Sequence, residues 1–199
     1  MIGSASIAQA ANLVSDGDFS NPSGGGGFVT YTGGTLIGPW TVTGASVDLI
    51  GGYWQSPTLG GGSVDLDGNA PGGVSQALTL GPGAYSLSFY LSANPDGGPP
   101  TKTVDVSVGS LLNDPFSYTI GSNSHGNMMY TLETVNFTTS GPTTLQFASA
   151  DVGTPYGPTI GGVSVTAIPE PATWAMMLLG VGAMGAGLRM SRRTQLRIA

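Results

Sequence analysis

Residues 85–92 read YSLSFYLS, an alternation of large apolar side chains with mostly small polar ones. When this segment is extended, Tyr85, Leu87, Phe89 and Leu91 share one face, and three serines and a tyrosine share the other. A period of two is typical of a β-strand with one face against a core. The segment therefore predicts a strand in a sheet that covers a hydrophobic interior.

Shorter runs with the same alternation occur at 104–108, 145–148 and 163–166. Glycine, proline, asparagine and aspartate bound these runs, as at 81–83 and 94–100. About eight to ten short strands are expected, with no helical period before residue 172. The sequence thus predicts an all-β sandwich.

The tetrapeptide SVDL occurs at 46–49 and again at 63–66. Two copies this close together are too short for a repeat domain. They are expected to be two strands of one sheet, and neighbours in it are one possibility. Alternation would turn valine and leucine inward and present Asp48 and Asp65 on the polar face.

The distribution of charge limits the classes of function. The chain has 199 residues, enough for one domain, and four of its five basic residues lie in the last eleven positions. Up to residue 168 there is one lysine against ten acidic residues, a formal charge of −9. Such a body repels phosphate backbones, so nucleic-acid binding is not expected. The absence of cysteine excludes disulfides, zinc–thiolate sites and a cysteine nucleophile.

An uncharged stretch covers residues 171–188 and is followed by Arg189, Arg192 and Arg193. A helix over about 172–188 would approach the ~30 Å thickness of a bilayer interior, with Trp174 at one headgroup level. The arginines, in a basic tail over 189–197, would then lie in the cytoplasm and the body outside it. The alternative is a buried core helix with a solvated tail.

Pro169, Glu170 and Pro171, followed by Trp174, the apolar stretch and the arginines, resemble the PEP-CTERM sorting signal. The resemblance implies recognition by an exosortase-type processing enzyme, removal of the helix, and transient anchoring in the inner membrane before release to the cell surface or extracellular matrix. Residues 169–199 would form this signal and residues 12–168 the β-sandwich. Residues 1–11, with Ala8-Gln9-Ala10, are interpreted as the remnant of a signal peptide; a plain tail is the alternative.

The body from Asn12 to about Val165, most clearly over residues 46–94, resembles the bacterial choice-of-anchor C family. The resemblance implies a galactose-binding-like jelly roll, similar to plant cell-wall proteins, and an extracellular setting. Such modules often hold a structural calcium ion with one carboxylate near the opening strand and one near the last strand. Here Ser20 and Gly161-Gly162 replace the usual acidic or amide residues, which leaves Asp16 and Asp18 as candidate ligands, with an Asx turn as the alternative.

Catalysis is not expected from the residues available. His125 is the only histidine, and no Gly-x-Ser-x-Gly motif accompanies it. A glycan hydrolase would need two carboxylates at a suitable separation, with Asp48, Asp65 and Asp67 as the candidates. Solubility and turn formation are the competing roles for these side chains.

A carbohydrate-binding module requires exposed aromatic rings beside polar groups. The candidates are Trp40, Tyr53 and Trp54 as rings, and Gln55, Asp65, Asp67 and Asn69 as polar partners. Either tryptophan can instead plug the sandwich, and this alternative is favoured for Trp40. The predicted function is non-catalytic association with exopolysaccharide or cell-envelope carbohydrate. A polyanionic matrix or adhesion protein without a sugar pocket is the alternative.

Overall fold

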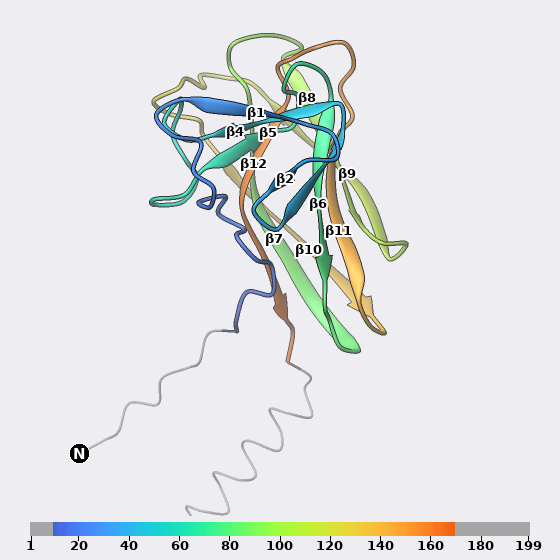
Figure 1. The fold of residues 1–199 in the computed structure, drawn as a ribbon. Coiled ribbons are helices and arrows are strands. Elements are labelled where there is room, and N and C mark those ends of the chain that lie inside the picture. The colour runs from blue at the N-terminus through green and yellow to red at the C-terminus, as the bar shows by residue number, and fades with distance from the viewer. Residues whose placement is uncertain (1–9, 170–199) are drawn as a thin grey trace, which may run out of the picture. The chain divides into compact units, whose positions relative to one another are not determined.

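The computed structural model describes residues 10–169, which form a sandwich of two six-stranded antiparallel sheets (Figure 1). The strands are β1 (Phe28–Thr32), β2 (Leu36–Ile37), β3 (Trp40–Gly44), β4 (Ser46–Ile50), β5 (Ser63–Asp65), β6 (Gly72–Leu78), β7 (Gly83–Ala93), β8 (Thr101–Val108), β9 (Leu112–Thr119), β10 (Thr131–Thr139), β11 (Thr143–Ser149) and β12 (Pro158–Ala167). Sheet A has the order β1-β4-β5-β12-β7-β10, and sheet B has the order β2-β3-β6-β11-β8-β9. The predicted all-β sandwich is confirmed, with two more strands than the upper end of the expected number.

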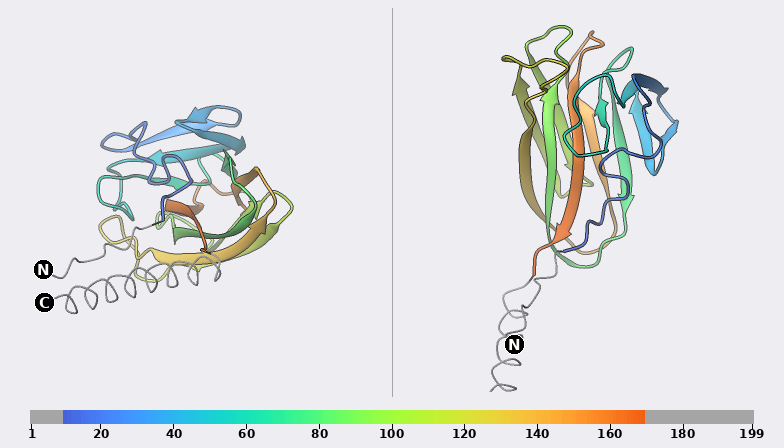
Figure 2. Two further views of the ribbon diagram at one scale, coloured as in Figure 1. Left: turned by 90° about the horizontal axis from the view of Figure 1, so that it is seen from below. Right: turned by 90° about the vertical axis from the view of Figure 1, so that its left-hand side faces the viewer.

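The last eight strands have the connectivity of a jelly roll. The chain alternates between the sheets from β5 to β8, turns back in a hairpin to β9, and alternates again to β12. Sheet A thus contains the series β5-β12-β7-β10, and sheet B contains β6-β11-β8-β9. This arrangement buries one face of each sheet against the other (Figure 2).

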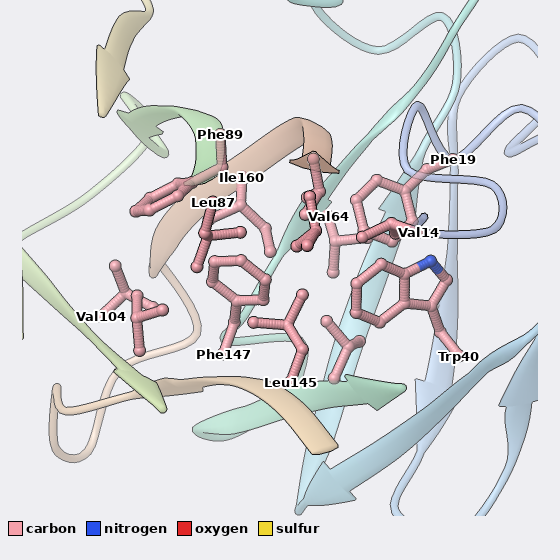
Figure 3. Packing of buried hydrophobic residues seen from close by; sticks show 14 of the residues in the cluster. Val14, Phe19, Trp40, Val64, Leu87, Phe89, Val104, Leu145, Phe147 and Ile160 are labelled. Atoms are coloured by element: carbon pink, nitrogen blue, oxygen red, sulfur yellow. The ribbon is translucent and has the colours of Figure 1, made fainter. Parts of the chain in front are cut away.

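The interior is built from the alternating residues that the sequence indicated. Leu87, Phe89 and Leu91 of β7 are fully buried and face Phe147 of the opposite sheet, with the rings of Phe89 and Phe147 5.1 Å apart (Figure 3). Trp40 also belongs to this core. Its side chain is 0% exposed, its ring lies 5.2 Å from that of Phe19, and its indole nitrogen donates to the Asp16 carbonyl at 3.0 Å. Trp40 therefore offers no face to a sugar, and its prediction as a binding residue is wrong.

The two SVDL segments are neighbouring strands. They form β4 and β5, paired so that Asp48 lies opposite Asp65 and Leu49 opposite Val64. Val47, Leu49, Val64 and Leu66 point into the core as predicted. The other face is not simply solvated, however, because Ser63 and Asp65 are also buried there. Loops cover this part of the outer face of sheet A.

The strand β12 carries a bulge at its centre. Its register against β7 shifts between Gly161 and Ser164, and Gly162 has a φ of 58°. A side chain at Gly162 would meet the ring of Tyr90, since a Cβ there would lie 2.8 Å from Cδ2. The Gly161-Gly162 pair thus has a structural cause in the bulge.

The described chain enters and leaves the sandwich at one end (Figure 1). The amide nitrogen of Leu13 donates to the carbonyl of Val165 at 2.8 Å, and the Asn12 side chain donates to the carbonyl of Val163 at 3.0 Å. The loops that follow β7 and precede β12 lie at the opposite end, because β7 ends there and β12 begins there.

The segments predicted for sorting fall mostly outside the described residues. These are residues 1–9 and everything from Glu170 onward, including the membrane helix expected at about 172–188 and the arginines that follow it. Within residues 10–169, the structure contains no helix with the length and apolar character needed to cross a bilayer.

Candidate functional site

A pocket of about 220 Å³ opens on the outer face of sheet A. The strands β1, β4 and β5 form its floor, and residues from four loops rise around it. These loops are 51–62, 66–71, 94–100 and 150–157. Segments that are far apart in the sequence therefore meet at this place.

The floor is a row of polar side chains fixed by strand register. Thr30 of β1 lies opposite Asp48 of β4, which lies opposite Asp65 of β5. Directly opposite residues of an antiparallel pair share one face, so these side chains project together from sheet A. The Thr30 hydroxyl donates to Oδ1 of Asp48 at 2.6 Å. Burial raises the pKa of Asp48, and the bond from Thr30 partly offsets this effect.

Tyr53 forms an aromatic wall of the pocket. Its side chain is 37% exposed, and its ring lies 5.2 Å from that of Phe28 and 4.5 Å from that of His125. The Tyr53 hydroxyl donates to Oδ2 of Asp96 at 2.9 Å, while His125 Nε2 lies 2.7 Å from Oδ1 of the same carboxylate. Asp96 thus holds the tyrosine in position from the opposite loop.

Trp54 and Gln55 support the loops around the pocket. Trp54 is only 5% exposed, packs with Ile50 and Met128, and donates from its indole to Oγ of Ser63 at 2.9 Å. Gln55 forms two hydrogen bonds with the 125–128 loop. Its backbone amide donates to the His125 carbonyl at 2.8 Å, and its side-chain oxygen accepts from the backbone amide of Met128 at 3.0 Å. Of the adjacent aromatic pair, Tyr53 is therefore exposed, and Trp54 is buried against Ile50 and Met128.

Asp65 lies beneath the pocket and is closed to solvent. Its Oδ1 accepts from the amides of Asp67 and Gly157, each at 3.0 Å, and its Oδ2 accepts from the side-chain amide of Asn94 at 2.6 Å. The Asp96 amide donates to Oδ1 of Asn94 at 2.9 Å, which fixes the orientation of that amide group. Burial raises the pKa of Asp65 to about 8. Asp65 thus anchors the loop that carries Asp96.

Lys102 joins two of the pocket loops from inside. Its side chain is 0% exposed, and its ammonium donates to the carbonyls of Gly97, at 2.8 Å, and Tyr156. Burial lowers the pKa of Lys102, while Asp65 and other nearby carboxylates act in the opposite direction. Asp67 is also buried, and burial raises its pKa to about 6. Asp65 and Asp67 therefore belong to an enclosed polar cluster, and the expectation that Asp65 lies on a solvated strand face is wrong.

Asn69 is the polar candidate that remains available at the rim. It is exposed, lines the pocket, and is positioned by a bond from its backbone amide to Oγ of Ser46 at 2.8 Å. Of the predicted set, Tyr53, Trp54, Asp65 and Asn69 line the pocket, and Tyr53 and Asn69 are the exposed ones among them.

Asp16 and Asp18 lie in a turn at the edge of the sandwich. Oδ1 of Asp16 accepts from the amides of Ser20, at 3.0 Å, and Asn21, at 3.1 Å, which is an Asx-type arrangement. Oδ1 of Asp18 accepts from the Ser20 hydroxyl at 3.0 Å. Residues 10–169 contain no cluster of three or more acidic or histidine side chains arranged for a metal ion. Oδ2 of Asp16 is buried and has no hydrogen-bond partner among the described residues, so calcium binding by Asp16 and Asp18 stays a prediction.

Sequence reasoning missed most of the pocket wall. Phe28, Asp96 and Tyr156 line it, and His125 supports it through its contacts with Asp96 and Tyr53. The sequence of residues 94–100 predicts only a turn between two strands. No local pattern indicates that its aspartate reaches a tyrosine 43 residues away.

Comparison with known proteins identifies the C-terminal segment. Residues 167–193 match the PEP-CTERM protein-sorting motif, so the chain carries the signal for export and exosortase-mediated sorting to the cell surface. The chain is also 33% identical over 150 residues to halomucin of Haloquadratum walsbyi (strain DSM 16790 / HBSQ001). That match covers 69% of this chain and 2% of halomucin, so the chain spans a very small part of that protein.

Among solved structures, the sandwich is similar to two modules from Paenibacillus barcinonensis. The first is a CBM35, with a TM-score of 0.44 and 20% identity over 70% of this chain and 99% of the module. The second is the CBM22-1 xylan-binding domain of Xyn10C, with a TM-score of 0.46 and 11% identity over 83% of this chain and 99% of the domain.

Proposed function

We propose that this protein is an exported surface protein whose β-sandwich binds extracellular or cell-envelope carbohydrate in the pocket on sheet A. The observation that carries the proposal is the side-chain content of this pocket, where Tyr53 and Tyr156 lie beside Asp48, Asn69 and Asp96. Aromatic rings provide a surface for the apolar face of a sugar, and carboxylate and amide groups bind hydroxyls. The PEP-CTERM motif supports an exported location, where such polymers occur.

The proposed role is binding without catalysis. Asp48 and Asp65 are cross-strand neighbours at the pocket and would be the candidates for a pair of hydrolytic carboxylates. Asp65, however, is closed to solvent and its two oxygens accept three hydrogen bonds from protein groups. A general acid must reach the glycosidic oxygen, and an enclosed carboxyl in this position does not.

The proposal is tested by binding of the purified full chain to the exopolysaccharide of the producing bacterium, with free sugars as competitors. Tyr53→Ala removes the exposed ring and should abolish saturable binding. Leu36→Ala, which removes an exposed apolar side chain from β2 in the other sheet, is the matched control and should bind normally. Binding that survives Tyr53→Ala would contradict the assignment of the pocket.

The charge of the body favours one second candidate function. A formal charge of −9 up to residue 168 suits a polyanionic matrix or adhesion protein, which would associate with polymers through ions. In that case salt should weaken the association, and neither simple sugars nor Tyr53→Ala should change it.

A further inference from the structure

We infer that the pocket selects sugars that carry a protonated amine, so that its ligand is a polysaccharide with unacetylated hexosamine units. This inference rests on the proposed carbohydrate-binding function and adds the chemical class of the sugar. It follows from two observations: the carboxylates of Asp48 and Asp96 line the pocket, and no lysine or arginine does so among the described residues.

Asp48 is a carboxylate at the pocket without a cation beside it. Its Oδ1 accepts from Thr30, and the residue is half-buried. In the part of the chain that the structure describes, the single contact between a carboxylate and a basic side chain within 4 Å joins Asp96 and His125, and it does not involve Asp48. Burial raises the pKa of Asp48, as expected for a carboxylate with no positive neighbour to stabilise its charge. An ammonium group on a ligand would supply that neighbour.

Among the residues that the structure describes, no lysine or arginine lines the pocket to receive an acidic sugar. The only lysine of the protein is Lys102, which is buried and directs its ammonium to the carbonyls of Gly97 and Tyr156. A uronate would therefore bring a third carboxylate toward Asp48 and Asp96. Like charges at short distance in a partly desolvated pocket repel one another, so acidic sugars are disfavoured.

The aromatic residues fit the same ligand. The ring of Tyr53 is partly exposed, and Tyr156 lines the pocket with it. A cation over a tyrosine face is attracted by the ring quadrupole, in addition to the contact that any pyranose makes with the ring. A hexosamine with a free amine combines an apolar sugar face with a positive group, which the pocket matches with aromatic rings and a carboxylate.

The test compares two oligosaccharides with the same backbone and linkage, one with free amines and one with acetylated amines, which are uncharged and bulkier. The purified full chain is titrated with a short β-1,4-linked glucosamine oligomer and with the corresponding N-acetylglucosamine oligomer. A galacturonate oligomer serves as the acidic probe. The glucosamine oligomer should bind about tenfold more tightly than its acetylated counterpart, and the galacturonate oligomer should bind most weakly.

Two matched variants separate the pocket from the general charge of the protein. Asp48→Asn preserves the shape of the side chain and an oxygen for the Thr30 hydroxyl, and it should remove the preference for the amine. Asp105→Asn removes the same charge from an exposed position on β8 in sheet B, and it should retain the preference. Equal losses in both variants would show general attraction between polyions and would overturn the inference.

The remaining outcomes distinguish this inference from the proposed function. If both oligomers bind equally and Tyr53→Ala removes both, carbohydrate binding stands and selection for an amine is wrong. Tighter binding of the galacturonate oligomer would also overturn the selection. If none of the probes nor the exopolysaccharide binds, the proposed function fails and the inference fails with it.

Discussion

The ammonium of Lys102 lies 2.8 Å from the carbonyl oxygen of Gly97, the residue that follows Asp96 in the loop 94–100. The same ammonium donates to the carbonyl of Tyr156, in the loop on the other side. One buried side chain thus ties together two loops that border the pocket. Lys102 is not among the residues that line the pocket, but it holds the loops that carry Asp96 and Tyr156.

Replacement of this cation should loosen the loops and leave the sandwich folded. Lys102→Met leaves two partly buried carbonyls without this donor, so the free energy of unfolding should fall by about 2 kcal/mol. Amide hydrogen exchange should become faster in residues 94–100 and 150–157. The strands β6 and β11 serve as the internal reference and should keep their protection. Unchanged exchange in both loops would show that Lys102 does not hold them.

Stability should decrease as the pH rises from weakly acidic to weakly alkaline values. Burial raises the pKa of Asp65 to about 8 and that of Asp67 to about 6, from an ordinary value of 3.8. The folded protein therefore binds more protons than the unfolded chain between about pH 4 and pH 8, and its free energy of unfolding falls across this window. Burial lowers the pKa of Lys102 from its ordinary value of 10.5. Between the lowered pKa and 10.5 the folded protein binds fewer protons than the unfolded chain at this residue, so this lysine makes the free energy of unfolding rise with pH.

Denaturant unfolding at about pH 5 and about pH 7.5 measures this dependence. Asp65→Asn should flatten the profile, because the amide does not titrate. Asp105→Asn, at an exposed position of β8, should leave the profile as it is. Greater stability at the higher pH would contradict the burial of protonated carboxyl groups in this cluster.

Sorting should depend on the prolines that precede the apolar C-terminal stretch. Proline has no amide hydrogen and disfavours a helix at the residue before it, so Pro169 and Pro171 are proposed to keep the recognition element extended. The double variant Pro169→Ala/Pro171→Ala should remain as unprocessed precursor in membrane fractions, measured by mass. Pro115→Ala, in an exposed position of β9, is the control and should be processed normally. Normal processing of the double variant would show that these prolines are not needed for recognition.

The sequence was sufficient to predict the sandwich because its strongest signals are local. The alternation over β7 and the repeated SVDL of β4 and β5 each follow from a period of two within one strand. A strand with one apolar face must cover a core, so these segments indicate the architecture without knowledge of their partners. The pairing of β4 with β5 was consistent with the repeat.

The pocket could not be predicted in the same way, since its parts come from separate loops. Alternation distinguishes two faces of a strand, but it does not distinguish solvent from a covering loop. Asp65 therefore looked exposed and is buried under the loops that contain Asn94 and Gly157. Trp40 is the complementary case, because a tryptophan after Gly38-Pro39 can lie at the surface or in the core. Its contacts with Phe19 and Phe147, which are distant in the sequence, place it in the core.

The direction of β12 has a mechanical consequence for a tethered protein. This strand begins at Pro158, beside the pocket loops, and runs for ten residues, about 30 Å, to Ala167 at the end where the chain leaves the sandwich. While the protein is anchored through its C-terminal segment, as expected before processing, tension between that anchor and a ligand in the pocket would be directed along the strand. The bonds from β12 to β7 would be loaded together in shear, and not broken one after another as in an unzipping hairpin. The hydrogen bonds on both sides of the bulge at Gly161-Gly162 would share the load, so the sandwich is oriented to resist drag.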